Sequence, residues 1–277
     1  MITQSASVDY EYLRQMVFRI SQNVLDPSRD YLFETRLSKL LRNEGMSHLE
    51  ELVDHLRIRK NSSLERAVAE AMTINETSFF RDNSPFELMR IALLPSLIER
   101  RRSSRTLRLW SAASSTGQEA YSLAMLLREH FPELASWKIE ILGTDISSEM
   151  VDRSRAGRYQ RIEINRGLPA RFLLKYLLRV DDEWEVSPDL RALCRFEQRN
   201  LCSLPFLFQA FDIILLRNVL LYFSAETRRH VLLQMHRALA PDGYLLLGSS
   251  EQPGMQRHWL PVLAESSCYY KPLPGSG

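Results

Sequence analysis

Short apolar runs alternate with helical stretches over most of the chain after Arg105. The run Phe211–Leu216 (FDIILL) is almost continuously apolar, as expected of a strand that is buried on both faces of a parallel sheet. Parallel neighbours need a long crossover connection, usually a helix, and these crossovers are right-handed. The alternation therefore predicts a doubly wound α/β sheet.

Apolar periodicity and turn residues place the individual elements. Pro241 and Gly243 lie between a well-patterned helix and the next apolar run, which predicts that the helix ends before them and that a strand begins after them. The expected strands are 107–110, 139–143, 211–216 and 244–248, and the expected helices are 117–130, 147–154 and 225–239.

The chain up to about Met72 has a different pattern. Apolar residues recur there at steps of three and four, as they do on the buried face of a helix. Pro27, Gly45 and Asn61 supply breaks between several short helices. We therefore expect an all-helical N-terminal domain over residues 1–75, followed by an α/β domain over residues 76–277.

The strand–helix alternation fails between Tyr159 and Asn200. Residues 183–186 and 194–197 have the pattern of two short strands joined through a Ser-Pro-Asp turn. We expect a small antiparallel β insertion at about 159–199. Such an insertion is often a recognition element, and a lid that only covers the edge of the sheet fits the pattern about as well.

Composition excludes several classes of protein. The chain has 36 Lys and Arg residues against 34 Asp and Glu, and its net charge of +2 predicts no nucleic-acid partner, because nonspecific binding draws on a clear excess of positive charge. The three cysteines lack the spacing of metal ligands or of a disulfide framework, which predicts no metal site and a reducing cytoplasm. No apolar run approaches the ~20 residues of a membrane span, and no secretory signal opens the chain, so we expect neither membrane insertion nor export.

Ligands of an open α/β sheet bind beyond the carboxyl ends of its strands. Small residues at 111–117 follow the first expected strand, and they allow a ligand to approach the backbone. The loop has only Gly117 in place of a G-x-G-x-x-G pattern, which disfavours a pyrophosphate ligand. Asp145 follows the second strand, where its carboxylate is placed either to bind a ribose diol or simply to cap the next helix.

A third polar group follows the strand 211–216. Arg217, Asn218 and Tyr222 stand together there, and such a cluster is awkward in a plain core but natural at the rim of a binding site. This place completes a set of three loops at the same expected edge of the sheet.

Four motifs, NETSFFRD, SAASSTGQEAYS, GTDIS and LRNVLLYFS, occur in this order along the chain. Together they resemble the chemotaxis receptor methyltransferases of the CheR type, and the resemblance covers nearly the whole chain. It implies S-adenosyl-L-methionine as cofactor, with S-adenosyl-L-homocysteine as product, and an S-adenosylmethionine-binding α/β domain behind a receptor-recognition helical domain. The implied reaction is methyl transfer to glutamate side chains of chemoreceptors, which forms methyl esters.

The resemblance also implies roles for single residues. Arg81 and Tyr222 are the implied catalytic residues, and Phe79 and Phe80 are placed to shield the sulfonium and adenine from water. Glu119 is implied to receive the amino group of the cofactor. The implied cofactor-binding residues are Asn75, Thr77, Arg81, Glu119, Asp145, Asn200, Leu201, Arg217 and Asn218.

The sequence departs from the family pattern at two places. Gln118 and Ala120 stand where the family commonly has Glu and Pro. The insertion lacks the glycine-bearing loop near 179–185 that, in some members, docks to a tethering peptide at the receptor's C-terminus. We therefore expect the partner to be the cytoplasmic domain of a methyl-accepting chemoreceptor, recognised without that tether.

A basic row, Arg36, Lys39 and Arg42, is spaced to lie along one helical face, which serves either to dock an acidic partner or only as a solvated surface. Two other functions stay open at this stage. One is methyl transfer to RNA or to a small molecule, and the other is a noncatalytic module that senses the cofactor. Stacking aromatics and a larger basic surface would favour the RNA substrate.

Overall fold

The computed structural model describes residues 8–59, 61–203, 210–254, 257–264 and 267–274. Contacts between residues divide the chain into two compact units. One unit runs to Ile74 and also includes the later segment Tyr222–Thr227, and the other contains Asn75–Leu221 and the chain from Arg228 onward.

The first unit consists mainly of four helices, whose apolar stripes meet in one core. Asp9 caps the first helix by accepting a hydrogen bond from the Tyr12 N–H, and Asn61 caps the fourth in the same way. Leu13, Leu37 and Leu52 are fully buried in the shared core. The helices are α1 (Tyr10–Ser21), α2 (Tyr31–Asn43), α3 (Leu49–Ile58) and α4 (Ser62–Ala71).

The segment Tyr222–Thr227 is tied to the end of α1. Asn23 and Phe223 form an antiparallel β-bridge, and the Val24 N–H donates to the Tyr222 carbonyl at 2.9 Å. The end of the LRNVLLYFS motif is therefore held by backbone hydrogen bonds to residues that directly follow the first helix.

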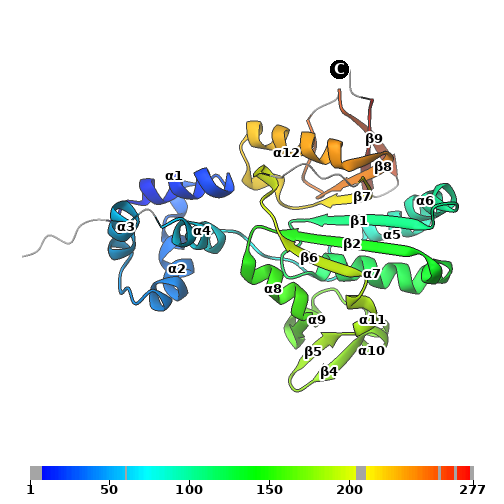
Figure 1. Ribbon diagram of the computed structural model, residues 1–277, viewed down its shortest axis with the longest axis horizontal. Coiled ribbons are helices and arrows are strands. Elements are labelled where there is room, and N and C mark those ends of the chain that lie inside the picture. The colour runs from blue at the N-terminus through cyan, green and yellow to red at the C-terminus, as the bar shows by residue number, and fades with distance from the viewer. Residues whose placement is uncertain (1–7, 60, 204–209, 255–256, 265–266, 275–277) are drawn as a thin grey trace, which may run out of the picture. The chain divides into compact units, whose positions relative to one another are not determined.

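The second unit is built on a seven-stranded sheet with the order β6-β2-β1-β7-β8-β10-β9 (Figure 1). The first five of these pair in parallel, and β10 is antiparallel to both of its neighbours. Every residue of β7 is buried, as its apolar sequence predicts. The strands are β1 (Thr106–Ala112), β2 (Lys138–Asp145), β6 (Cys194–Gln198), β7 (Phe211–Leu216), β8 (Leu239–Leu247), β9 (Trp259–Ala264) and β10 (Ser267–Pro272).

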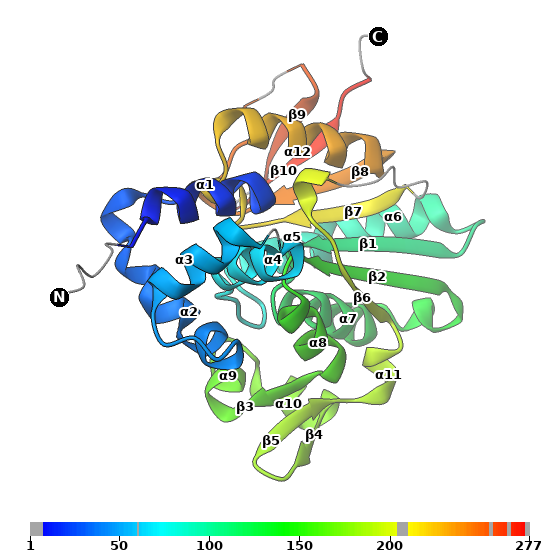
Figure 2. The same cartoon turned by 60° about the vertical axis from the view of Figure 1, so that its left-hand side comes forward.

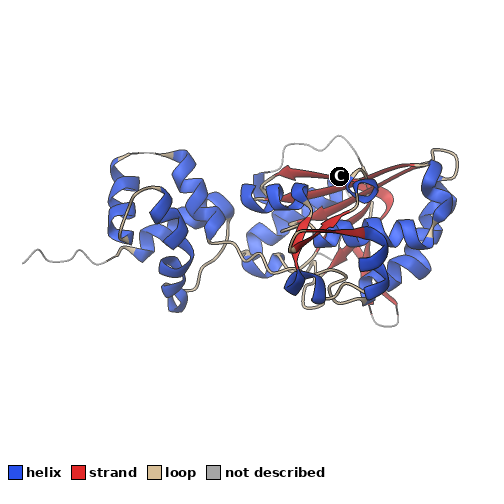
Figure 3. Cartoon of the chain, turned by 90° about the horizontal axis from the view of Figure 1, so that it is seen from below, coloured by secondary structure: helices blue, strands red, loops and turns tan. Residues whose placement is uncertain are grey.

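Helices cover both faces of this sheet (Figure 3). From β1 the chain moves to β2 and then β6 on one side, whereas the step from β7 to β8 runs the opposite way. Right-handed crossovers then place α7 and α8 on one face and α12 on the other. The predicted doubly wound α/β fold is confirmed. The helices are α5 (Ser84–Leu88), α6 (Leu94–Arg101), α7 (Gln118–His130), α8 (Ser148–Ala156) and α12 (Ala225–Ala238).

The start of β8 differs from the prediction of a strand at 244–248. β8 begins at Leu239, which pairs with Phe211, and the register then shifts so that Ile213 pairs with Tyr244. The Pro-Asp-Gly sequence forms an irregularity inside the strand instead of a turn before it. Gly243 is needed there, because a Cβ would lie 2.9 Å from the Asp212 carbonyl.

The antiparallel insertion is present, but one predicted strand belongs elsewhere. The small sheet has the order β3-β5-β4 and lies beside α9–α11 on the β6 side of the main sheet (Figures 1 and 2). The predicted strand 194–197 is β6, which pairs in parallel with β2 and forms the edge of the main sheet. Phe196 accounts for this pairing, because its ring packs where a Cβ of Gly143 would lie, at 2.5 Å. The insertion contains β3 (Arg158–Gln160), α9 (Arg161–Asn165), α10 (Ala170–Tyr176), β4 (Leu177–Val180), β5 (Glu183–Val186) and α11 (Pro188–Arg191).

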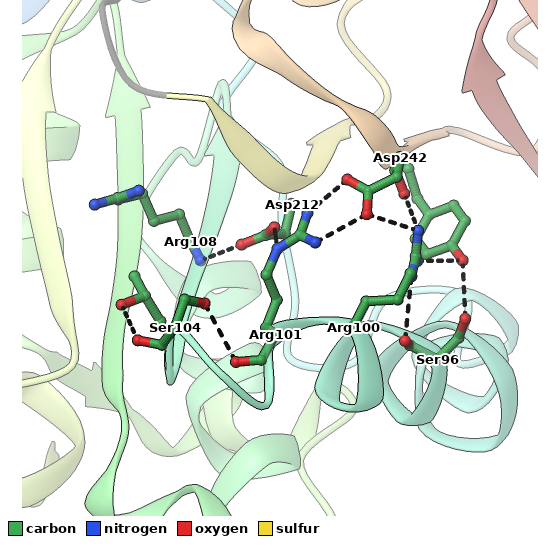
Figure 4. A network of polar contacts seen from close by, with 9 residues as sticks. Ser96, Arg100, Arg101, Ser104, Arg108, Asp212 and Asp242 are labelled. Carbon is green, nitrogen blue, oxygen red and sulfur yellow. Dashed lines mark hydrogen bonds and ion pairs between the residues drawn. The ribbon is translucent and has the colours of Figure 1, made fainter.

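A network of charged groups joins the end of α6 to the sheet (Figure 4). Arg101 contacts Asp212 at 2.7 Å and Asp242 at 2.6 Å, and Asp212 also accepts the Arg108 N–H at 2.8 Å. The hydrogen bond from Arg101 is the main cause that lowers the pKa of Asp242. Arg101 therefore has a structural role between α6, β7 and β8.

We expect Asp212→Ala to lower the free energy of unfolding by about 3 kcal/mol, because it leaves the Arg101 guanidinium and a strand N–H short of a partner. Urea denaturation followed by circular dichroism measures this. Glu99→Ala is the control, because its ion pair with Arg102 is largely exposed and contributes less than about 0.5 kcal/mol. Equal stability of the two variants would contradict a structural role for the network.

Candidate active site

The loops that carry three of the motifs meet at one edge of the sheet. β1 lies between β2 and β7, and all three run in the same direction, so their carboxyl ends are neighbours. The strand order reverses at β1, and open α/β sheets bind ligands beside such a reversal. The segments after Ala112, Asp145 and Leu216 thus lie together, as predicted from the sequence.

The loop after β1 is held in an unusual backbone conformation. Ala113 and Ser115 have positive φ values of 62° and 49°, which side chains other than glycine rarely adopt. The Ser114 N–H donates to the Thr144 carbonyl and the Ser115 N–H to Asp145, each at 2.8 Å. These bonds fix the loop against the end of β2. Such strain concentrates at ligand sites, where the surroundings enforce it.

Asp145 joins two of the loops. Its side chain is buried, and it accepts the Ser115 N–H on one oxygen and the Ser147 N–H on the other, at 2.8 and 3.0 Å. The N-cap of α8 is Ser147, which accepts from the Met150 N–H. Simple helix capping therefore does not describe Asp145, and its place at the strand end supports the ribose role that the sequence predicts.

Arg217 lies at the centre of the polar contacts, and its side chain is only 2% exposed. Its guanidinium contacts Glu119 at 2.8 Å and Asp82 at 2.7 Å, and it donates to the Arg81 carbonyl at 2.8 Å. Glu119 also accepts from the Ser111 hydroxyl at 2.7 Å. One buried cation thus connects the β1 strand end, the start of α7, the NETSFFRD motif and the turn after β7.

Asp82 and Ser111 were not singled out by the sequence analysis. Asp82 closes the NETSFFRD motif, and its position next to Arg81 is the signal that could have marked it. Ser111 is buried at the end of β1, where its hydroxyl is indistinguishable in sequence from the other small residues of the loop.

The first motif runs from Asn75 along this edge of the sheet. The Asn75 carbonyl accepts from the Ser115 hydroxyl at 2.7 Å, and the Phe80 N–H donates to the Ser122 hydroxyl at 3.0 Å. Arg81 is partly exposed and donates to the Glu76 carbonyl at 3.0 Å. Thr77 lies within the same loop.

The two adjacent phenylalanines are anchors in the hydrophobic core. Phe79 is fully buried and meets Tyr159 edge to face, with ring centroids 5.1 Å apart. Phe80 packs on Phe86 and Phe172 at 5.2 and 5.3 Å. These contacts fasten the motif to the β insertion and to α5, so both rings have a packing role.

Asn200 and Leu201 follow β6 in a short 3₁₀ turn (Leu201–Ser203). The Asn200 side chain accepts the Cys202 N–H at 2.9 Å, and Leu201 is buried. Burial raises the pKa of Cys202 to about 12 and also raises that of Cys194, so both remain uncharged thiols at neutral pH.

Asn218 and Tyr222 stand on the turn after β7. Asn218 has a positive φ of 58°, and Tyr222 ends the 3₁₀ turn η5 (Leu220–Tyr222). Tyr222 belongs to the helical unit. Of the other predicted residues, Glu119 contacts Arg217 and Asp145 contacts the loop after β1.

Two buried polar atoms at this edge of the sheet are left unsatisfied by the described residues. Within the described part of the chain, the Ser114 hydroxyl and the Arg217 Nε have no hydrogen-bond partner. Buried groups of this kind are normally satisfied. A ligand that combines a carboxylate, an ammonium group and ribose hydroxyls fits this set of donors and the neighbouring carboxylates Glu119 and Asp145.

This fold and this site define an S-adenosylmethionine-binding methyltransferase domain. Residues 75–268 match the family model described as "CheR methyltransferase, SAM binding domain", and residues 8–74 match "CheR methyltransferase, all-alpha domain". The chain belongs to the CheR methyltransferase family. The resemblance seen in the motifs is confirmed, and S-adenosylmethionine is the cofactor.

Curated relatives match most of the chain. It is 39% identical over 251 residues to "Chemotaxis protein methyltransferase 1" of Pseudomonas aeruginosa, which covers 89% of this chain and 91% of that protein. It is 35% identical over 272 residues to "Chemotaxis protein methyltransferase Cher2" of Pseudomonas putida, with 96% and 98% covered. A Vibrio cholerae relative, "Chemotaxis protein methyltransferase 1", is 41% identical over 232 residues, with 82% and 83% covered.

The described residues match neither the pattern of a metal site nor that of a membrane-spanning helix. The described residues contain no cluster of three or more His, Cys, Asp or Glu side chains arranged to bind a metal ion. None of the described helices has the length and apolar character that a membrane crossing requires.

We expect Asp145→Ala to weaken binding of S-adenosylhomocysteine about tenfold or more, because the carboxylate and the loop that it holds are both lost. Isothermal titration calorimetry measures the affinity, and circular dichroism checks that the fold is intact. Asp152→Ala is the control, since that side chain is 74% exposed on α8. Unchanged affinity in Asp145→Ala would remove the ribose assignment.

Proposed function

We propose that this protein transfers the methyl group of S-adenosylmethionine to glutamate side chains on the cytoplasmic helices of chemoreceptors. The products are glutamyl methyl esters and S-adenosylhomocysteine. The observation that carries the proposal is the match of both domains, over nearly their full length, to proteins named chemotaxis methyltransferases. The convergence of the motif residues on one buried arginine supports it.

The proposed reaction requires little acid–base catalysis from the protein. Bound S-adenosylmethionine supplies an electrophilic methyl group on a positively charged sulfur. A glutamate with a pKa near ~4.3 is already ionised at neutral pH, so its oxygen attacks without a general base. One carboxylate oxygen would take the methyl group, and the electron pair of the carbon–sulfur bond would remain on sulfur. The side chains need only align the acceptor and exclude water.

We assign that alignment to Arg81 and Tyr222. Arg81 lies on the strained loop whose Phe80 and Asp82 have positive φ values, and Asp82 ties this loop to the buried Arg217. A guanidinium held in this way suits a carboxylate, either of the cofactor or of the incoming glutamate. Tyr222 ends the turn that begins at Arg217, and we assign it the positioning of the methyl group or the acceptor.

The helical unit is the proposed receptor-recognition domain. Arg36 donates to the carbonyls of Met72 and Thr73 at 2.9 and 3.3 Å, so it helps to close the end of α4. Lys39 and Arg42 are exposed on the same face of α2, and we assign this face to contact with an acidic helix. The proposed partner is therefore a cytoplasmic chemoreceptor helix with acidic side chains.

We further propose that this partner is recognised without a C-terminal tethering peptide. β4 and β5 are joined by only two residues, of which Asp181 takes a positive φ of 53°. This tight connection contains no glycine-bearing loop. The geometry supports direct recognition of the receptor helices.

Radiolabelled methyl transfer to a purified receptor cytoplasmic domain tests the proposal. We expect label on the receptor that is released by mild base, as from a methyl ester. A receptor domain with its candidate glutamates replaced by alanine is the control and should remain unlabelled. Label on RNA or on a small molecule, or no transfer by a protein that binds the cofactor, would refute the receptor assignment.

The two assigned catalytic residues should differ in their effects. We expect Tyr222→Phe to lower kcat about tenfold with little change in cofactor affinity, and Arg81→Ala to lower kcat and also weaken cofactor binding. Steady-state kinetics and calorimetry measure both quantities. Tyr31→Phe and Arg102→Ala are matched controls, because both side chains are largely exposed. Wild-type kcat in both site variants would refute the assignment.

A further inference from the structure

The carboxylate of Glu251 binds the backbone of the turn after β7. Glu251 lies in the loop after β8 and is buried, with 7% of its surface exposed. One oxygen accepts the Asn218 N–H at 2.7 Å and the Gly248 N–H at 2.8 Å, and the other accepts the Leu220 N–H at 2.7 Å. A buried carboxylate therefore gathers three backbone donors from two neighbouring loops.

The backbone is shaped to fit this carboxylate. Asn218 takes a left-handed conformation with φ of 58°, which Asn adopts more readily than most other residues. Gly248 leaves the space that the carboxylate needs, because a Cβ there would lie 2.6 Å from Glu251 Oε2 and 2.9 Å from the Asn218 N. Concave groups of N–H donors of this kind bind anions.

The turn after β7 is held in two ways, through the side chain of Arg217 and through its own backbone. The Arg217 side chain is held by Glu119 and Asp82, whereas the Glu251 carboxylate accepts backbone N–H groups. Glu251 instead holds the backbone between Arg217 and η5, the 3₁₀ turn that ends at Tyr222. Loss of Glu251 should loosen the approach to Tyr222 while the contacts of Arg217 persist.

We propose that Glu251 is a positioning residue for methyl transfer, which fixes the turn Arg217–Tyr222 through the N–H groups of Asn218 and Leu220. The inference rests on the proposed function, because it assigns Glu251 an effect on the acceptor step through Tyr222. Glu251, Gly248 and Asp82 also line a cavity of about 840 Å³, which provides room for water to hydrate the freed N–H groups in a variant. The fold is therefore expected to survive the substitution.

Glu251→Gln is the sharpest variant, because it keeps the size of the side chain and replaces one accepting oxygen with an NH₂ group that cannot accept. We expect kcat to fall about tenfold or more, with the affinity for S-adenosylhomocysteine changed less than about threefold. Glu251→Asp retains both oxygens and should recover part of the rate. Glu133→Gln, at an exposed glutamate outside the site, is the control and should match the wild type.

Hydrogen–deuterium exchange supplies a readout that does not depend on activity. The amides of Asn218 and Leu220 should exchange faster in Glu251→Gln, whereas those of α7 should be unchanged. Wild-type kcat or unchanged exchange at these two amides would overturn the inference. Parallel losses of rate, cofactor affinity and thermal stability would also overturn it, by showing a general structural role. A wild-type protein that binds cofactor but methylates no receptor would instead refute the proposed function.

Discussion

The buried guanidinium of Arg217 is the interaction on which the site depends. It is almost fully removed from solvent and contacts two carboxylates, one on α7 and one on the loop that follows the paired phenylalanines. Removing one partner of a buried ion pair typically costs about 3–5 kcal/mol, because it leaves a charge without compensation. Three segments distant in sequence are therefore held in one arrangement. Asp82 and Asn218 in these segments are left-handed, a conformation that Asp and Asn adopt more readily than most residues.

The same arrangement explains why an enzyme of this class needs no nucleophile or base of its own. In the proposed reaction the acceptor glutamate is already ionised, and burial keeps the Cys194 and Cys202 thiols protonated. What the protein contributes is a fixed geometry at the sheet edge. Charged and hydrogen-bonded supports such as Asp145, Glu119 and Glu251 maintain that geometry by holding loops and backbone N–H groups in place.

Much of the fold could be predicted from sequence because its signal is local. The apolar run of β7 and the helical periodicity of α7 and α12 each identify an element without knowledge of its neighbours. The predictions were wrong where pairing between distant segments determines which strand a residue joins. Gly243 signals a turn, but the space beside the Asp212 carbonyl makes it part of β8. Phe196 alternates like a strand of the insertion, but its fit over Gly143 adds that strand to the main sheet.

In the candidate site too, some residues could be predicted from local sequence, and others depend on contacts with distant segments. Arg217 and Asp145 follow strands and carry recognisable motifs, so their position at the sheet edge could be predicted. The packing of Phe79 and Phe80 could not be predicted, because their partners, Tyr159 and Phe172, lie far along the chain. Glu251 was missed because it acts on backbone N–H groups, which leave no pattern in the side chains.

A crystal structure of the complex with S-adenosylhomocysteine would test the central claim most directly. We predict that the amino-acid end of the ligand lies beside Glu119 and the Nε of Arg217, with its ribose against Asp145. A ligand bound elsewhere, for example in the cavity lined by Trp259 and Tyr270, would contradict a site organised around Arg217.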